Sequence, residues 1–429
     1  MSEHRQGLQK VNTLNQFFKP ALSALQSQIL RDTGVVFGAN LAARGLSFLF
    51  FILAARWLSV SEYGVVKYTI SWAAALCVLT APFSLAWTRA LAGQVQQHDS
   101  AAWTLVGLRA FILLLTCTLL VGSIWVWADR QLDWSAILVL VGLSIFYAYE
   151  GYLNGQFAFS KLAGYMVLGN GFQLSVLWVL RQYVPSVLSP TTLLSLYGIA
   201  FIIPVIVVDQ SWCKFSVWQR VRHHDLLKTL IKSALALAIV HNAHSLMMNL
   251  DIILLGYFCG ESQVGYYGVA KTILTSILVL TQAAFTVILP TSARAKEWDK
   301  KRLIQTTELV LLIALLLVCG GVILAPQIVR LLFSDRYEPA VPALRVLIIG
   351  GWFYSVLMLL AAQGLGQKRD GIYGKMYVVA LGVNVVLDLA LLPLFGAIGA
   401  AWGFLLSSFA GGVLALIEQR RFPGLIHQD

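Results

Sequence analysis

Charged residues are scarce in this sequence. Only 12% of its 429 residues are charged, whereas 58% are hydrophobic. A soluble globular domain carries about 25% charged residues. So much apolar surface cannot all be buried in one soluble core, and we therefore expect a membrane protein whose remaining apolar surface faces lipid.

Acidic residues and cysteines are also few. The formal net charge is +11, from 31 Lys and Arg against 20 Asp and Glu. The basic residues fall in short segments between apolar runs, which indicates membrane topology and argues against nucleic acid as a partner. The five cysteines lack the spacing of metal ligands or of a disulfide framework, so we expect them to be buried in apolar packing.

Enzyme motifs are missing as well. The sequence has no Walker loop, no Gly-x-Ser-x-Gly, no dinucleotide fingerprint and no acidic cluster with metal spacing. We therefore expect neither an enzyme nor a cofactor, and transport driven by ATP is disfavoured.

The N-terminal segment 1–32 lacks the continuous apolar core of a cleavable signal peptide. Its apolar side chains recur at steps of three and four from Leu8 to Ile29. This spacing predicts an amphipathic helix on the membrane surface, interrupted at Pro20. A polar tail with chance periodicity is the alternative.

Long apolar runs follow the N-terminal segment. Because a spanning helix needs about 20 mostly apolar residues, we predict twelve membrane helices. Their ranges are 34–57, 63–88, 103–127, 136–157, 163–182, 191–209, 231–257, 263–291, 304–324, 342–362, 374–394 and 397–417. The connections between them are short and leave no room for a soluble domain.

The distribution of basic residues predicts the orientation of these helices. With the N-terminus in the cytoplasm, most lysines and arginines lie in inside loops, and the outside loops hold few. Every inside loop carries basic residues, including the segment 210–232 between spans six and seven. Both termini are therefore predicted to be cytoplasmic.

Two short echoes indicate an internal repeat. The residues that lead into span two, 58–65, resemble those that lead into span eight, 259–266, at an offset of 201. A Gly-Gln pair also follows both span four and span ten. Six spans plus six spans in the same orientation form a parallel repeat. The predicted organisation is an interfacial segment (1–32), two six-helix lobes (33–212 and 231–421) joined by a cytoplasmic linker (213–230), and a tail (422–429).

Three motifs resemble one family of transporters. Span one carries Gly38, Arg44 and Arg56 and runs directly into Leu-Ser-Val-Ser-Glu-Tyr-Gly at 58–64. The second motif is Gly-Tyr-Tyr-Gly-Val-Ala-Lys at 265–271, and the third lies at 331–345. The chain resembles the Wzx-type polysaccharide flippases of the multidrug/oligosaccharidyl-lipid/polysaccharide exporter superfamily. Ser59 stands where that family has a glycine.

This resemblance implies an all-α membrane protein whose two lobes enclose a central cavity and open it alternately to each side. It implies transport of an undecaprenyl-pyrophosphate-linked oligosaccharide from the inner to the outer leaflet of the bacterial inner membrane, for surface polysaccharides such as lipopolysaccharide. Membrane lipid, a coupling proton or sodium ion and a polysaccharide polymerase are the expected partners. A multidrug exporter of the same superfamily and a membrane polysaccharide polymerase or ligase are the alternatives.

Basic side chains inside spans are the first candidate site residues, because they are costly in lipid and usually face a cavity or a partner. Arg44 lies near mid-bilayer in span one, where its guanidinium can pair with a phosphate. Lys67 in span two and Lys271 in span eight are predicted to flank the same anionic headgroup. A structural ion pair is the alternative for Arg44, and extension to the membrane interface is the alternative for Lys67.

Span seven is the most polar of the predicted helices. His241 and His244 can carry protons or form hydrogen bonds to sugar hydroxyls. Asn242 is a further candidate for substrate binding, and Asp251 is a candidate for ion coupling. Polar packing between helices is the alternative for the whole stripe. No third ligand for a metal site is evident beside the two histidines.

Glu150, in the inner half of span four, is the second candidate for binding a coupling proton or sodium ion. An ion pair with Arg44 or Arg109 is the equal alternative. Asn384 and Asp388 in span eleven are expected to make interhelical hydrogen bonds instead of binding a ligand.

Aromatic side chains concentrate near the predicted ends of spans, where amphipathic rings anchor at the membrane interface. These residues include Trp57, Tyr63, Trp103, Trp125, Trp127 and Trp134. An aromatic platform for sugars is the alternative.

Overall fold

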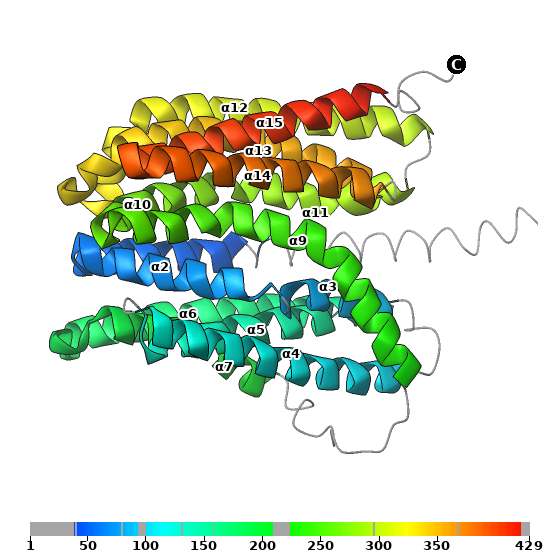
Figure 1. Cartoon of the computed structure of the whole chain (residues 1–429), viewed down its shortest axis with the longest axis horizontal. Coiled ribbons are helices and arrows are strands. Elements are labelled where there is room, and N and C mark those ends of the chain that lie inside the picture. Colours follow the sequence, from blue (N-terminus) through cyan, green and yellow to red (C-terminus); the bar gives the residue numbers. More distant parts are fainter. Residues whose placement is uncertain are drawn as a thin grey trace, which may run out of the picture.

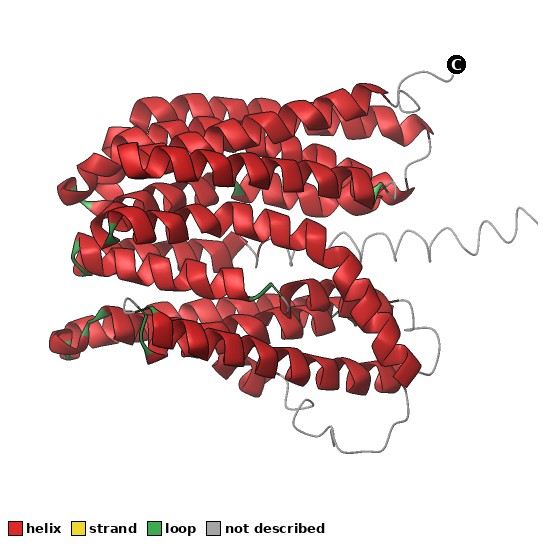
Figure 2. Cartoon of the chain, viewed as in Figure 1, coloured by secondary structure: helices red, strands yellow, loops and turns green. Residues whose placement is uncertain are grey.

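The computed structural model describes residues 38, 41–78, 80–92, 100–129, 132–156, 158–208, 224–294, 297–366 and 369–421. Throughout these ranges the chain forms helices joined by short turns, and no strand occurs in them (Figure 2). The predicted all-α fold is therefore confirmed. The predicted interfacial segment, the tail and most of the predicted linker lie outside the described residues.

The first helix occupies residues 41–57, and further α-helices and two short 3-10 helices follow in chain order. Their bounds are α2 (Val60–Leu76), α3 (Thr80–Ala92), α4 (Ser100–Ala128), α5 (Trp134–Gly155), α6 (Phe159–Tyr183), η1 (Pro185–Val187), α7 (Pro190–Val208), α9 (His224–Cys259), α10 (Glu261–Ile277), α11 (Val279–Arg294), α12 (Glu297–Phe333), η2 (Asp335–Ala340), α13 (Val341–Gly366), α14 (Asp370–Phe395) and α15 (Ala397–Arg421).

Several of these helices can cross a membrane. Among the described residues, seven helices are long and apolar enough, and the number rises to nine if each bent pair counts as one span. The pairs are α2 with α3, bent by 50°, and α10 with α11, bent by 43°. They coincide with predicted spans two and eight. A multi-pass helical membrane protein is confirmed, and the count of twelve crossings stays a prediction.

The helices gather into two groups (Figure 1). Helices α3–α7, here called the N-terminal bundle, lie on one side, and α10–α15, the C-terminal bundle, lie on the other, with α2 and α9 between them. Helix α9 packs against both α14 and α3, so it links the bundles. Its 36 residues extend for about 54 Å. It begins at His224, inside the segment predicted as a linker.

The two halves of the chain meet where α2 packs against α10. A Cβ on Gly64 or Gly265 would clash with a backbone carbonyl at the start of the opposite helix. Beside the glycines, the hydroxyls of Ser61 and Ser262 lie 2.7 Å apart. Ser61 and Ser262 are 201 residues apart, the same offset as the sequence repeat. Equivalent positions of the two halves therefore face each other in a reciprocal contact.

The repeat also appears in how its helices begin and end. Ser59 caps α2: its hydroxyl accepts a hydrogen bond from the Glu62 N–H at 3.3 Å, and its own N–H donates to the Glu62 carboxylate at 2.8 Å. The equivalent cap of α10, Gly260, has φ +80°, which favours glycine. Ser59, with φ −67°, needs no glycine, and it stands where the motif of the similar flippases has one. The glycines of the second echo, Gly155 and Gly366, end α5 and α13.

Two arginines reinforce the contact between α2 and α10 at one end of the molecule. This end, here called the outer end, contains Ser59 and Gly260, and the distribution of basic residues predicts that it faces away from the cytoplasm. Arg56 donates to the carbonyls of Leu331 and Leu332 at the end of α12, with Nε 2.7 Å from the second carbonyl. Arg336 in η2 donates back to the end of the first helix, 2.6 Å from the Ala55 carbonyl. Cations stabilise helix C-termini. Arg56 therefore caps α12, Arg336 caps the first helix, and together they join the two halves.

Two expectations about individual side chains need correction. Cys117 and Cys319 are exposed rather than buried, because a spanning helix can turn apolar side chains toward lipid without burying them. Tyr63 is not an interface anchor: it is fully buried, with its hydroxyl 3.2 Å from Thr272 Oγ1 across the α2–α10 contact. Trp127, by contrast, is 89% exposed near the end of α4.

A cysteine pair tests the α2–α10 contact. Ser61→Cys combined with Ser262→Cys, in a chain whose native cysteines are replaced by alanine, should form a disulfide under mild oxidation because the two side chains touch. Cleavage at a protease site engineered within residues 213–223 should then leave the two halves joined on a non-reducing gel.

Leu120→Cys with Leu316→Cys provides the matched control, since both side chains are exposed on separate bundles. This pair should release two fragments with or without reductant. Release of two fragments by the Ser61/Ser262 pair before reduction would contradict the contact.

Candidate functional site

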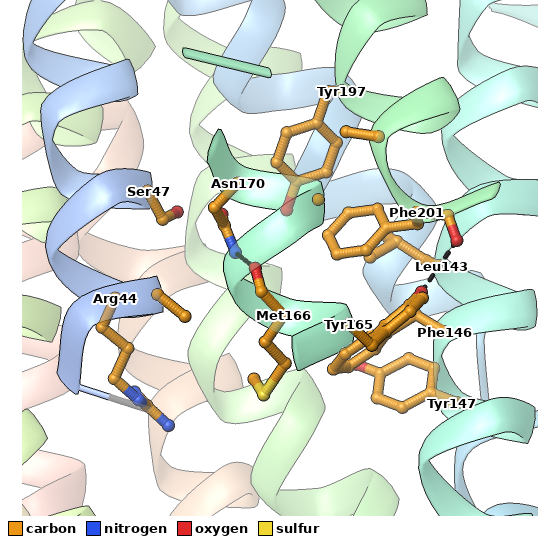
Figure 3. Close-up of a pocket in the computed structure, with 13 residues that line it drawn as sticks. Arg44, Ser47, Leu143, Phe146, Tyr147, Tyr165, Met166, Asn170, Tyr197 and Phe201 are labelled. Atoms are coloured by element: carbon orange, nitrogen blue, oxygen red, sulfur yellow. Dashed lines mark hydrogen bonds between the residues drawn. The ribbon is translucent and has the colours of Figure 1, made fainter. Parts of the chain in front are cut away.

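A cavity lies within the N-terminal bundle, beside the first helix. Its volume is about 260 Å³. The first helix, α5, α6 and α7 contribute the lining, with Arg44 and Ser47 on one side and a set of aromatic rings on the other (Figure 3). The lining residues are Ala43, Arg44, Ser47, Leu143, Phe146, Tyr147, Tyr165, Met166, Gly169, Asn170, Tyr197, Ala200 and Phe201.

Arg44 supplies the positive charge of this cavity. Glu150 on α5 lies close enough for its charge to interact with that of Arg44. Within the part of the chain that the structure describes, no hydrogen-bond acceptor reaches the Arg44 guanidinium. Its five N–H donors are therefore available to a ligand.

Lys67 lies at the junction of the two halves. Its ammonium is 3.6 Å from the centroid of the Phe51 ring and 5.7 Å from that of Tyr63. Its aliphatic stem packs on Gly268 of α10. The ammonium is thus held by aromatic faces instead of extending to the interface. No carboxylate among the described residues pairs with it, so its charge also remains available to an anion.

A second polar cluster is buried within the C-terminal bundle. Lys271 on α10 forms an ion pair with Asp251 on α9, and the Tyr267 hydroxyl donates to the same carboxylate. Asp388 on α14 brings a second carboxylate, whose charge interacts with both members of the pair. Asp251 and Asp388 are 0% exposed and Lys271 is 5% exposed. The ammonium is therefore bound by Asp251, and Asp388 is a second carboxylate beside this pair.

Asp388 and Asn384 lie one turn apart on α14 and are the site residues that sequence reasoning set aside. Both carboxylate oxygens of Asp388 and both amide atoms of Asn384 lack a hydrogen-bond partner within the described residues. Gly403 of α15 closes over Asp388 with no room for a side chain. Unsatisfied buried polar groups are rare and costly. The expectation that Asn384 and Asp388 make interhelical hydrogen bonds is therefore wrong. Their role could have been inferred from the sequence, because an amide and a carboxylate lie four residues apart in an apolar span.

The polar residues of α9 have several different partners. The His244 Nδ1 atom lies 2.6 Å from the Tyr354 hydroxyl of α13. The Asn242 amide donates to the Val78 carbonyl after α2 at 3.0 Å. The His241 side chain lies outside the described residues. Packing between helices, the alternative reading of this stripe, therefore accounts for His244 and Asn242. In the ranges that the structure covers, no group of three His, Cys, Asp or Glu is placed to hold a metal ion.

The aromatic wall of the cavity was also missed from the sequence. Phe146, Tyr147, Tyr165, Tyr197 and Phe201 lie within helices rather than at their ends. From the sequence, anchoring at the membrane interface was favoured for the aromatic residues, with an aromatic platform for sugars as the alternative, and the residues named were those near span ends. The four-residue spacing of Tyr197 and Phe201 places both rings on one helix face, and this spacing could have indicated the aromatic wall from the sequence.

Comparisons with known proteins decide the family. The family model described as "Polysaccharide biosynthesis protein" matches residues 29–296, and the one described as "Lipid II flippase MurJ" matches residues 171–428. This chain belongs to the flippase families of the multidrug/oligosaccharidyl-lipid/polysaccharide exporter superfamily. The flippase is accordingly a multi-pass membrane transporter and not an enzyme.

Curated relatives agree with this assignment. "Probable flippase AglR" of Haloferax volcanii is 31% identical to this flippase over 180 residues, which cover 39% of this chain and 37% of AglR. "Uncharacterized membrane protein MJ1068" of Methanocaldococcus jannaschii is 28% identical over 236 residues, or 52% of this chain and 44% of the relative. The flippase thus spans less than half the length of these two relatives. It covers 99% of "Uncharacterized membrane protein MJ1375" from the same organism at 20% identity.

Solved structures share the fold of the flippase. Lipid II flippase MurJ in an inward closed conformation superposes with a TM-score of 0.70 at 13% identity, covering 90% of this chain and 87% of MurJ. A multidrug resistance MATE family transporter in an inward-facing conformation gives 0.68 at 15% identity, covering 90% of this chain and 95% of that one. The fold is therefore common to flippases and multidrug transporters, and the two family models given above describe a polysaccharide biosynthesis protein and a lipid II flippase.

Variants of the buried pair test the C-terminal cluster. Asp251→Asn or Lys271→Met alone should lower the stability of the flippase by about 3–5 kcal/mol, because each leaves a buried charge uncompensated. The double variant should recover much of that loss. Thermal unfolding in detergent measures the effect.

Arg330→Met is the matched control, since Arg330 pairs with Glu338 at 2.6 Å on the exposed outer surface. This control should leave the unfolding midpoint unchanged. Single variants of the buried pair that unfold like the wild type would show that the cluster is not ionised.

Proposed function

We propose that the flippase moves an undecaprenyl-pyrophosphate-linked oligosaccharide from the inner to the outer leaflet of the bacterial inner membrane, with both termini in the cytoplasm. The observation that carries the proposal is Arg44, an arginine inside a span that faces a cavity and has no protein acceptor among the described residues. A guanidinium can bind a phosphate through two parallel hydrogen bonds. Lys67 supplies a second free cation toward the junction of the halves.

The proposed mechanism is alternating access between two six-helix lobes, 33–212 and 231–421. The closed α2–α10 contact and the paired arginine caps at the outer end support a state that is sealed toward the outside. Arg44 lies about 20 Å below the end of the first helix at 1.5 Å per residue, in the inner half by the predicted topology. The headgroup is bound there, and separation of α2 from α10 then releases it outward.

The buried carboxylates are the proposed coupling site. Asp251 is held by Lys271, whereas Asp388 and Asn384 keep free polar atoms beside that pair. A proton or sodium ion on Asp388 would neutralise the excess negative charge of the cluster. Glu150 is the corresponding group in the N-terminal bundle. A phosphate bound to Arg44 would compete with the Glu150 carboxylate for the positive charge of Arg44. Lys271, being paired and buried, is assigned to coupling and not to the substrate.

A multidrug exporter and a polysaccharide polymerase or ligase are less well supported. Inside the N-terminal bundle and at the junction, the basic side chains Arg44 and Lys67 outnumber the single carboxylate Glu150, which suits an anionic substrate better than a cationic drug. A polymerase or ligase needs space for chemistry outside the membrane. The outer connection η2 has only 6 residues. A polysaccharide polymerase is instead proposed as a partner that consumes the flipped product.

Translocation in proteoliposomes tests the role of Arg44. Arg44→Ala should slow the transfer of undecaprenyl-pyrophosphate-linked glycan to the opposite leaflet by roughly 10- to 100-fold, because a hydrogen bond to a charged group contributes about 1.5–3 kcal/mol. Arg44→Lys should retain part of the rate, since it keeps the charge but loses the bidentate geometry. The appearance of glycan at the outer surface, detected with a lectin, measures the rate.

Arg345→Ala is the control, because Arg345 is exposed and donates only to the Val322 carbonyl at 3.3 Å in the described structure. It should flip the glycan normally. An Arg44→Ala protein that keeps the wild-type rate would refute the phosphate role. An imposed proton or sodium gradient should accelerate the wild type and not Asp388→Asn, and equal acceleration of both would refute the coupling role of Asp388.

A further inference from the structure

A tyrosine from the outer connection η2 lies at the contact between the two halves. Tyr337 is 0% exposed, and its ring contacts Tyr63 of α2 at 6.0 Å and Tyr266 of α10 at 6.5 Å between centroids. The charged residues of η2 are exposed instead. The short helix η2 therefore has a charged outer face and places one aromatic side chain at the contact that separates in the proposed mechanism.

Hydrogen bonds seat η2 on the end of the first helix. The Tyr337 hydroxyl donates to the Ala55 carbonyl at 3.1 Å, and the Arg336 guanidinium donates to the same carbonyl at 2.6 Å. Arg336 also donates to the carbonyl of Arg56. The last carbonyls of a helix have no partner within it, and water can satisfy them as well. Therefore η2 can leave this seat without breaking the first helix.

The backbone that leads into η2 is strained. Ser334 has φ +94°, and it is the only non-glycine residue with positive φ among those that the structure describes. Two other outer turns have a positive φ, and glycine occupies both: Gly260 at +80° and Gly396 at +54°. A side chain at positive φ raises the free energy of the backbone. The chain thus avoids this cost at two outer turns and keeps it at the start of η2.

The hydroxyl of the same serine adds a second cost. Ser334 Oγ is buried and has no hydrogen-bond partner within the described ranges. Buried polar groups without a partner are rare, and strained backbone persists only where the surrounding contacts outweigh it. Arg336 and Tyr337 supply those contacts directly after Ser334. If η2 left its seat, Ser334 could relax to negative φ and its hydroxyl could reach water.

We infer that η2 is a strained plug of the outer end: Arg336 and Tyr337 seat it on the first helix, and it turns outward about Ser334 when α2 separates from α10. The seating contacts and the strain at Ser334 oppose each other. This inference rests on the proposed function, because it names the segment that moves in the outward-opening step. In a static loop, relief of the strain would stabilise the fold without changing access to the residues beneath Tyr337.

A cysteine beneath the plug reports its position. Thr272→Cys, in a full chain whose native cysteines are replaced by alanine, places a thiol on the far side of Tyr63 from Tyr337, because Tyr63 contacts both residues. Thr272 is 4% exposed. A membrane-impermeant maleimide added to spheroplasts, which present only the outer face, should therefore label this thiol only when the outer end opens.

Two kinds of variant in this reporter chain should change the labelling rate in opposite directions. Tyr337→Ala should raise it roughly tenfold, because an aromatic contact and a hydrogen bond that hold the seated state are lost. Ser334→Gly should lower it roughly fivefold, because strain is removed from the seated state. Ser334→Ala removes the buried hydroxyl but keeps the strained backbone, so its rate should lie between those of Ser334→Gly and the unmodified reporter.

Two further variants separate the plug from an effect on folding. Tyr337→Phe keeps the ring and loses only the hydrogen bond to Ala55, so it should give a smaller increase than Tyr337→Ala. Tyr183→Ala is the matched control, since Tyr183 is a tyrosine at the outer end of α6 that is 75% exposed. It should leave the labelling rate unchanged. Thermal unfolding in detergent shows which variants are folded.

Each result has a distinct meaning. Labelling of Tyr337→Phe and Tyr337→Ala at the rate of the reporter alone would overturn the plug. Labelling of Ser334→Gly as fast as the reporter, or faster, would overturn the strained hinge. Neither result bears on the proposed function, because labelling requires no glycan. Conversely, a wild type that moves no glycan, while the variants keep the expected order of labelling rates, would contradict the proposed function and leave the plug in place.

Discussion

The cost of a charge in lipid is the constraint on which this structure depends. The charged side chains within the helices satisfy it in different ways. Lys271 is paired with Asp251, Lys67 lies over the Phe51 ring, and Arg56 donates to helix-end carbonyls. Arg44 differs from these side chains. The charge of Glu150 interacts with it, but Glu150 accepts no hydrogen bond from the Arg44 guanidinium. A cation retained in a costly position without full compensation is what an anionic substrate requires.

The contact between the halves follows from a second constraint. Helices in a membrane associate through close packing and small residues, since lipid removes the hydrophobic drive. Gly64 and Gly265 allow the backbones of α2 and α10 to touch. One apolar core then runs through both halves, whereas a separate core around Trp87 and Tyr152 belongs to the N-terminal bundle and the start of α9. The halves are thus joined most closely near the outer end, which is the geometry that a hinged transporter needs.

Much of the fold could be predicted from the sequence because it depends on local properties. Hydropathy located the helices, and the 201-residue offset indicated a repeat, although it did not show that the equivalent residues Ser61 and Ser262 touch. The pairing of charges could not be predicted, because it depends on which helices pack together. Lys67 and Lys271 were expected to flank one headgroup. In the structure Gly268 lies against Lys67, and Lys271, three residues further along α10, turns into the C-terminal bundle.

The cavity was predicted only in part for the same reason. Arg44 was identifiable because a charge in an apolar run stands out at the level of one helix. The rings opposite it come from α5, α6 and α7, and an aromatic residue in an apolar span carries no signal of its own. Asp388 and Asn384 were noticed for their spacing, but their lack of partners is a property of the packed bundle. Single-helix features were therefore accessible, and features shared between helices were not.

The most direct measurement of the central claim is the identity of the lipid that the flippase carries. The full chain, purified in mild detergent from its native membrane, would be analysed by native mass spectrometry with fragmentation of bound ligands. The account predicts a polyprenyl-pyrophosphate glycan bound in stoichiometric amount, and its loss in Arg44→Ala. Bulk phospholipid alone, bound equally by the wild type and the variant, would contradict it.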